Sequence, residues 1–229
     1  MKNSIKVILA IGLVLPLAFS ACKKEDSGDS RLNISAGIVN GSSTVNKFSL
    51  VQSGNLVFDT GYVWVREIVF DGEMDNNTSI SKTVERFSKI DFVSGVANPS
   101  LDDVIIPAGT YTSVNLGVEL RDEDNQPAIM MWGTYTRSDN SVVPIRFEFN
   151  SGEVFEAESS GTATVQSDEV ATARITFDPS VWFSVVSANQ LDNANTNNDG
   201  VLVVSENMNS AIFDAVADRL DISTQAEFQ

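Results

Sequence analysis

Oxygen-bearing residues recur at a fixed spacing between residues 195 and 206, the stretch of this chain with the clearest capacity for chemistry. Side-chain carboxylates, side-chain amides and backbone carbonyls are the ligands that Ca²⁺ prefers in proteins. Such groups stand at positions one, three, five, seven and twelve of the stretch, counted from its first residue. The predicted ligands are Asn195, Asn197, Asp199, the backbone carbonyl of Val201, and Glu206.

The spacing resembles the calcium loop of EF-hands, which has a glycine at position six for a sharp turn, and Gly200 stands there. Asp199 and Glu206 are the two charged ligands, and a site with so few charges is expected to be weak, with a Kd of roughly 10⁻⁴–10⁻³ M. The alternative is a plain turn at residues 198–200. Glu206 would then open a helix whose dipole favours an acid at that end.

Other catalytic chemistry is restricted by residue types that the sequence lacks. It contains no histidine and one cysteine, Cys22. This excludes Ser-His-Asp and Cys-His catalysis, histidine-based metal sites and, within the chain, a disulfide. A carboxylate-dependent glycoside hydrolase stays open as a less favoured alternative, since nothing selects a facing pair among 31 acids. The acidic stretches 71–75 and 122–124 are either cation loops or solvated turns.

The N-terminus has the organisation of a secretory signal peptide. Lys2 and Lys6 supply a short basic region, and the apolar run over residues 5–19, interrupted by Lys6, Gly12 and Pro16, is shorter than the roughly 20 residues of a membrane-spanning helix. Small residues, Ser20 and Ala21, then precede Cys22. This arrangement resembles the lipobox of bacterial lipoproteins, and the resemblance implies removal of residues 1–21 and lipidation of Cys22. An ordinary signal peptide followed by a chance cysteine is the alternative.

Residues 22–31 have the composition of a flexible tether, with charged, Ser and Gly residues that cannot form a core. Within the tether, Lys24, Glu25 and Asp26 resemble the export signal of surface lipoproteins from Bacteroidetes-type bacteria. The resemblance implies a protein that is held in the outer membrane by its lipid and exposed on the cell surface. Without that signal, these three residues are simply part of the solvated tether.

The net charge of −16 argues against partners with a phosphate backbone, because such partners need clustered positive charge. Nucleic-acid binding is therefore not expected. Residues 32–229 are enough for one sizeable core, and no linker long enough to separate a second domain interrupts them. We expect a single domain.

Alternating apolar and polar residues, with turn signals between them, predict a mainly β fold, a β-sandwich-like domain with a short helical C-terminal part. Helical segments are expected at about 180–220, with Ser205 capping a helix over 206–220. A polar loop is expected over 71–81. Strands are expected over residues 32–39, 47–51, 55–58, 62–70, 84–92, 112–121, 128–137, 142–150, 153–158, 162–165 and 170–178.

The run Val104-Ile105-Ile106-Pro107-Ala108-Gly109-Thr110-Tyr111 places a Pro-Ala-Gly turn before a strand that starts with tyrosine. It resembles the uncharacterised transthyretin-like and carbohydrate-binding-like sandwich domains of secreted lipoproteins. The resemblance implies a fold for residues 32–179 more than a function. We expect Tyr111 to pack its ring in the core and to bond its hydroxyl to the backbone.

Aromatic residues are the candidates for a glycan-binding platform, although aromatics on such apolar strands more often belong to the core. By strand alternation, Tyr62 and Trp64 share one face of their strand, and Met130 and Trp132 share one face of theirs. The full set of candidates is Tyr62, Trp64, Tyr111, Trp132, Tyr135 and Trp182.

The sequence therefore predicts a membrane-anchored surface lipoprotein that is not an enzyme. Its expected role is a binding or envelope-assembly module for a glycan or protein ligand. A weak calcium-binding module that uses the loop over 195–206 is the alternative. No cofactor other than this Ca²⁺ is expected.

Overall fold

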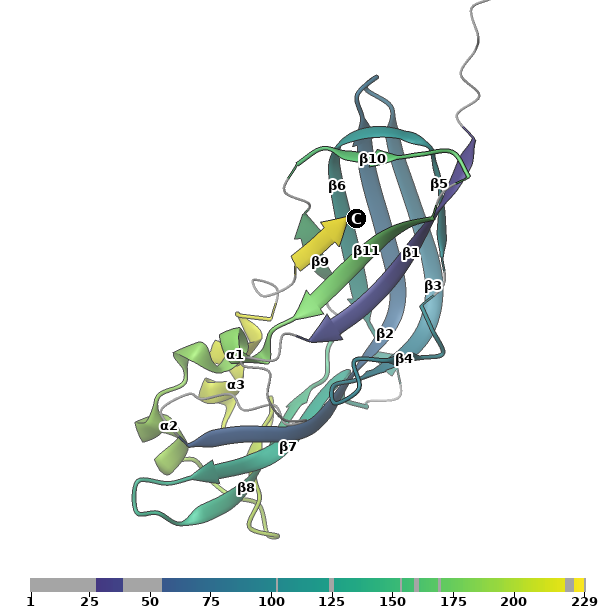
Figure 1. Cartoon of the computed structure of the whole chain (residues 1–229). Helices are drawn as coiled ribbons and strands as arrows, with labels where there is room; N and C mark the ends of the chain where they lie inside the picture. The colour runs from purple at the N-terminus through teal and green to yellow at the C-terminus, as the bar shows by residue number, and fades with distance from the viewer. Residues whose placement is uncertain are drawn as a thin grey trace, which may run out of the picture.

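The computed structural model describes residues 28–38, 55–101, 103–123, 126–152, 154–158, 161–168, 170–220 and 225–228. Cys22, residues 24–26 and the strand expected over 47–51 lie outside these ranges. Strands dominate the described residues, and they form two sheets with short helices near the C-terminus (Figure 1). The predicted mainly β, sandwich-like fold is confirmed.

The smaller sheet has the strand order β13-β11-β1-β5. In it, β1 runs parallel to β11 and antiparallel to β5. Figure 1 shows β1 and β11 crossing in front of the long strands of the other sheet. The bounds are Asp29–Ile38 for β1, Val104–Pro107 for β5, Val170–Phe177 for β11 and Gln225–Phe228 for β13.

The larger sheet has the order β10-β6-β2-β7-β8-β12, with β3 beside β2, β4 beside β3 and β9 beside β6. Its strands are β2 (Leu56–Met74), β3 (Ser79–Asp91), β4 (Ala97–Asn98), β6 (Gly109–Leu120), β7 (Ile129–Thr136), β8 (Val142–Phe149), β9 (Val154–Glu158), β10 (Ala163–Val165) and β12 (Leu202–Val204).

The 19-residue strand β2 connects both halves of the larger sheet. Its first half pairs with β7, its second half pairs with β6, and a register shift between Val65 and Glu67 lies where the partner changes. Val63, Val65, Ile68 and Phe70 are fully buried on the face towards the smaller sheet and the helices. The residues between them are more exposed and form what we call the outer face.

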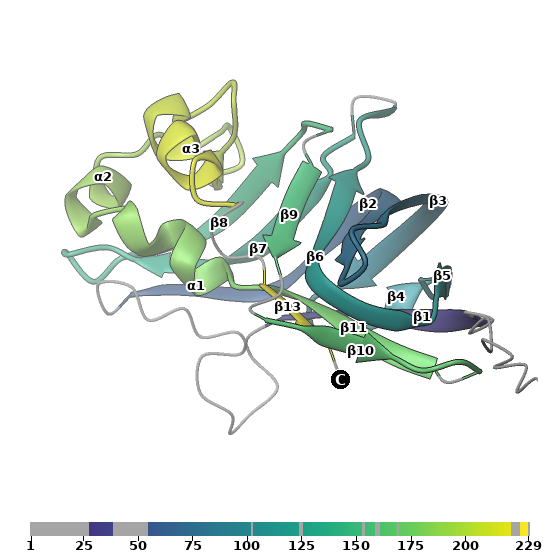
Figure 2. The same cartoon turned by 90° about the horizontal axis from the view of Figure 1, so that it is seen from above.

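The helices cover the inner face of the sheet at the end formed by β7 and β8 (Figure 2). Phe183 packs against Phe58 and Phe147, with ring centroids 5.0 and 5.4 Å apart, and Phe213 stacks on Phe149 at 5.9 Å. Packing on an apolar surface, rather than length, stabilises such short helices. They are α1 (Pro179–Trp182), the 3₁₀ helix η2 (Phe183–Val185), α2 (Ala188–Asp192) and α3 (Ser210–Ala217).

Several predicted boundaries were wrong. The separate strands expected over 55–58 and 62–70 are both part of β2. Most of the polar loop expected over 71–81 belongs to strands. Strand β2 continues to Met74 and β3 begins at Ser79, both with polar side chains on the outer face, so only the residues between them form a turn. The helix expected over 206–220 begins only at Ser210. Strand β13, which pairs with β11, was not predicted.

Candidate functional site

The six aromatic candidates divide between the core and the surface. Tyr111, Tyr135 and Trp182 are fully buried. As expected, the Tyr111 hydroxyl bonds to the backbone, donating to the carbonyl oxygen of Pro107 at 2.7 Å. Tyr62, Trp64 and Trp132 are partly exposed on the outer face of the large sheet. These three rings alone remain candidates for ligand contact.

Strand register brings the surface aromatics together from β2 and β7. Trp64 stands opposite Lys89 of β3, and Tyr62 stands opposite Met130 of β7. Arg121, which follows β6, donates its backbone N–H to the carbonyl oxygen of Trp64. We call this surface the aromatic patch and define it as Tyr62, Trp64, Lys89, Arg121, Met130 and Trp132.

Cations and rings are interleaved across the patch. The Tyr62 and Trp132 ring centroids are 5.8 Å apart. The Lys89 ammonium lies 4.2 Å from the Tyr62 ring centroid and 5.9 Å from that of Trp64. The Arg121 guanidinium lies 5.2 Å from the Trp64 ring. The three cation–ring distances are within the range of cation–π attraction, so the hydrogen-bond donors of Lys89 and Arg121 lie beside the rings.

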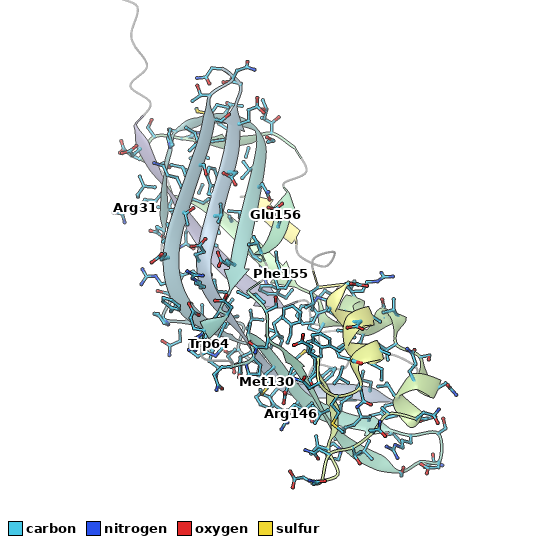
Figure 3. The ribbon with its side chains drawn as sticks, turned by 180° about the vertical axis from the view of Figure 1, so that it is seen from behind. Arg31, Trp64, Met130, Arg146, Phe155 and Glu156 are labelled. Carbon is cyan, nitrogen blue, oxygen red and sulfur yellow. The ribbon has the colours of Figure 1, made fainter. Side chains whose placement is uncertain are left out.

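The patch also contains a neutral hydroxyl and borders an ion pair. Burial and, next, the charge of Glu148 raise the pKa of Tyr62, although Arg121 opposes the shift. Tyr62 therefore keeps its proton at neutral pH. Arg146 and Glu148 of β8 form an ion pair and stand opposite Trp132 and Met130. Figure 3 shows Trp64, Met130 and Arg146 following one another down the sheet, seen from the outer face.

A carboxylate row lies beyond the patch on the same face. Glu67 of β2 stands between Glu85 of β3 and Glu119 of β6. A hydrogen bond that the protonated Glu67 donates to Glu119, followed by burial, raises the pKa of Glu67. An Arg66 nitrogen lies 2.9 Å from Glu119 Oε1. Since Glu67 and Glu119 touch, this pair leaves no room for a glycosidic bond between them, unlike the pairs that glycosidases use.

The other acidic stretches also have defined places. Asp71 and Glu73 are exposed on the outer face of β2. Asp122 and Glu123 lie 3.9 and 3.6 Å from Arg66 in oxygen–nitrogen distance, so their charges are partly compensated. In the part of the chain that the structure describes, no three Asp or Glu side chains gather as a metal site.

The predicted calcium loop forms a turn with internal hydrogen bonds. Asn197 Oδ1 accepts hydrogen bonds from the backbone N–H groups of Asp199 and Val201, at 3.0 and 2.9 Å. Gly200 has φ of +76°, a conformation that glycine adopts freely. The Asn195 backbone is held separately, because its N–H and carbonyl both bond to the side chain of Asn209.

The end of that loop differs from the expected helix start. Leu202–Val204 pairs in parallel with β8, and Glu206 stands exposed in the turn that precedes α3. Asp199 is exposed as well. Calcium binding by Asn195, Asn197, Asp199, Val201 and Glu206 stays a prediction.

Sequence reasoning missed Lys89 and Arg121. Neither is adjacent in sequence to an aromatic residue of the patch, and only the pairing of β3, β2 and β6 brings them there. The available signal was the alternation along 62–70 and 84–92, which gives the face of each residue but not the register between strands.

Comparisons with protein-family models, with curated proteins and with solved structures found no match for this chain. None of the helices in the described ranges is long and apolar enough to span a membrane.

Proposed function

We propose that this protein is a lipid-anchored, surface-exposed binding module that is not an enzyme and that binds glycan through the aromatic patch. The observation that carries the proposal is the group of three partly exposed aromatic rings on a sheet face that the core does not use. Isolated exposed apolar residues need no explanation, but a contiguous group of rings interleaved with cations indicates a contact surface.

The chemistry of the patch suits sugars. The C–H groups on one side of a pyranose ring are weakly positive and stack on the negative face of an aromatic ring. Sugar hydroxyls both donate and accept hydrogen bonds. Lys89 and Arg121 supply donors, Glu148 supplies an acceptor, and the neutral Tyr62 hydroxyl can do either. A few polar groups around an apolar surface is the usual composition of a small-molecule site.

The anchor is the second part of the proposal. Cys22 with its preceding lipobox supports lipidation, and Lys24, Glu25 and Asp26 support export to the outer face of the outer membrane. Two or more acyl chains are enough for stable attachment. A glycan-binding patch on such a protein would hold polysaccharide at the cell surface.

The experiment compares polysaccharide binding by the full-length protein with that of Trp64→Ala and Trp132→Ala, using affinity electrophoresis and calorimetry. A lost aromatic stack costs about 0.5–1.5 kcal/mol, so each variant should bind its glycan about twofold to tenfold more weakly. Val170→Ala, on an exposed valine of the smaller sheet, is the control and should bind normally.

Cross-strand aromatic pairs also stabilise sheets, so the Tm of the same variants must be measured by thermal unfolding. If Trp64→Ala and Trp132→Ala lowered the Tm but bound every tested glycan like the parent, the patch would be structural and the proposal would fail.

A further inference from the structure

A second feature of the outer face lies near the end of β2. A hollow of about 380 Å³ opens between two rows of short polar side chains. One row is Ser81, Asp71 and Asn115, and the next is Ser79, Glu73 and Ser113, taken in each case from β3, β2 and β6. Gly72, Ile80 and Val114 line it between the rows.

The hollow lies on the same face as the aromatic patch. Inward residues of β2 near it, such as Phe70 and Met74, do not line the hollow, whereas the outward residues Asp71 and Glu73 do. The register shift between Val65 and Glu67 places one extra residue, Arg66, on the outer side and so keeps the alternation in phase. Tyr62, Trp64, Asp71 and Glu73 therefore all face outwards.

The surface between the aromatic patch and the hollow leaves room for an extended ligand. The row next to the hollow consists of Thr83, Val69 and Gly117, which are small or of modest size. Nearer the patch, Phe87 is 50% exposed in the bulge of β3 that lies opposite Arg66. An exposed ring thus stands on the path as well, next to the carboxylate row.

We propose that the glycan is a neutral polysaccharide chain lying along β2, stacked on the aromatic patch and hydrogen-bonded in the hollow. This inference rests on the proposed function. At about 3.3 Å per step, the 11 residue-to-residue steps from Tyr62 to Glu73 span on the order of 36 Å. A disaccharide cannot reach both features, whereas an extended chain can.

The acidic residues in and near the hollow favour a neutral polysaccharide over an anionic one. The hollow has two carboxylates, Asp71 and Glu73, and no cation in its lining. The row beyond Thr83, Val69 and Gly117 holds Glu67, Glu85 and Glu119, of which Glu119 is paired with Arg66. A chain of uronates or sulfated sugars would be repelled there, while neutral hydroxyls can donate to the same oxygens.

The test measures affinity against chain length with cello-, xylo-, manno- and malto-oligosaccharides and their parent polysaccharides, using the full-length protein. The hollow variant is Asp71→Ala/Glu73→Ala, the patch variant is Trp64→Ala, and the control is Asp214→Ala, an exposed acid on α3. Thermal unfolding confirms that each variant is folded.

Affinity should rise from disaccharide to long chain. The hollow variant should lose about a hundredfold or more in affinity for long chains, because two hydrogen bonds to charged groups are removed, and nothing on disaccharides. The patch variant should lose affinity for both lengths, and the control for neither.

Equal affinity for short and long chains, or a hollow variant that binds long chains like the parent, would overturn the inference while leaving the patch as the site. A preference for anionic polysaccharide, or binding only to a protein, would overturn it as well. A patch variant that binds every ligand normally would instead remove the proposed function itself.

Discussion

The hydrogen-bond network around Tyr135 allows the sharpest stability prediction, because it links the β7–β8 hairpin to α2. The Tyr135 ring is fully buried, and its hydroxyl donates to Asp192 Oδ1 at 2.7 Å, with the Ala188 carbonyl oxygen at 3.2 Å. The backbone N–H of Ser138 donates to the same carboxylate oxygen at 3.1 Å, and its hydroxyl donates to Oδ2. The carboxylate thus joins three segments of the chain.

Tyr135→Phe removes the hydroxyl and keeps the ring. A hydrogen bond to a charged group contributes about 1.5–3 kcal/mol, and a domain of this size loses roughly 2–4 °C of Tm per kcal/mol. We therefore expect the Tm at pH 7 to fall by about 3–12 °C, measured by circular dichroism. The double variant with Asp192→Ala should lose less than the sum of the single variants, because both remove the same bond.

The alkaline pH dependence of this difference is an independent check. Burial, and then the hydrogen bond and charge of Asp192, raise the pKa of Tyr135 to about 12, whereas an unfolded tyrosine titrates near pH 10. Below about pH 10 the hydroxyl is protonated in both states, and its stabilisation is fully present. Above that the unfolded state ionises first, so up to about 2.7 kcal/mol is lost as the pH rises through about 12.

Tyr135→Phe lacks this group, so its deficit relative to the parent should shrink between about pH 10 and about pH 12. A deficit that stayed constant across that range, or a variant as stable as the parent at pH 7, would refute the reasoning.

Three further predictions concern other parts of the chain. Gly133→Ala should lower the Tm strongly or prevent folding, because a Cβ there would lie 1.9 Å from the carbonyl oxygen of Val57 on β2; an unchanged melting curve would contradict this packing. Cys22→Ala should abolish incorporation of labelled fatty acid in cells, and a variant that still took up label would exclude lipidation at Cys22. If the 195–206 loop binds calcium, saturation at a hundred times the Kd adds about 2.7 kcal/mol and raises the Tm of the full-length protein by about 5–11 °C. Asp199→Ala/Glu206→Ala should lose that shift, and a Tm unaffected by millimolar calcium would refute the site.

Local patterns in the sequence predicted the longer strands but not which strands pair. Alternation located these strands, since a sheet with one buried face imposes a two-residue period, and it missed the short strands β4, β5 and β13. It failed at Thr60-Gly61, because a register shift of β2 against β7 looks like a turn in the sequence. It failed again at residues 71–74, where Gly72 stands at an inward position and hides the period.

The predicted start of the C-terminal helix was wrong because pairing between distant strands overrides the local signal. Ser205 followed by apolar residues at helical spacing satisfies the local rules for a cap, yet Leu202–Val204 pairs with β8 and the chain then turns through Ser205–Met208. Parallel pairing of this kind, like that of β1 with β11, joins segments far apart in sequence, and no local pattern contains it.

The aromatic residues show the same limit at the candidate site. Trp64 and Trp182 have equally apolar neighbours in the sequence, yet Trp182 fills the core between Phe92 and Phe177 while Trp64 faces outwards between Lys89 and Arg121.

The inner face of β2 is already covered by the smaller sheet and the helices, so the outward rings are not needed to complete the core. A stabilising role for them would therefore be confined to their cross-strand neighbours, each contributing roughly 0.2–1 kcal/mol. Replacing Trp64 should thus change the Tm little while weakening ligand binding markedly, and this separation of the two effects distinguishes a binding surface from a structural cluster.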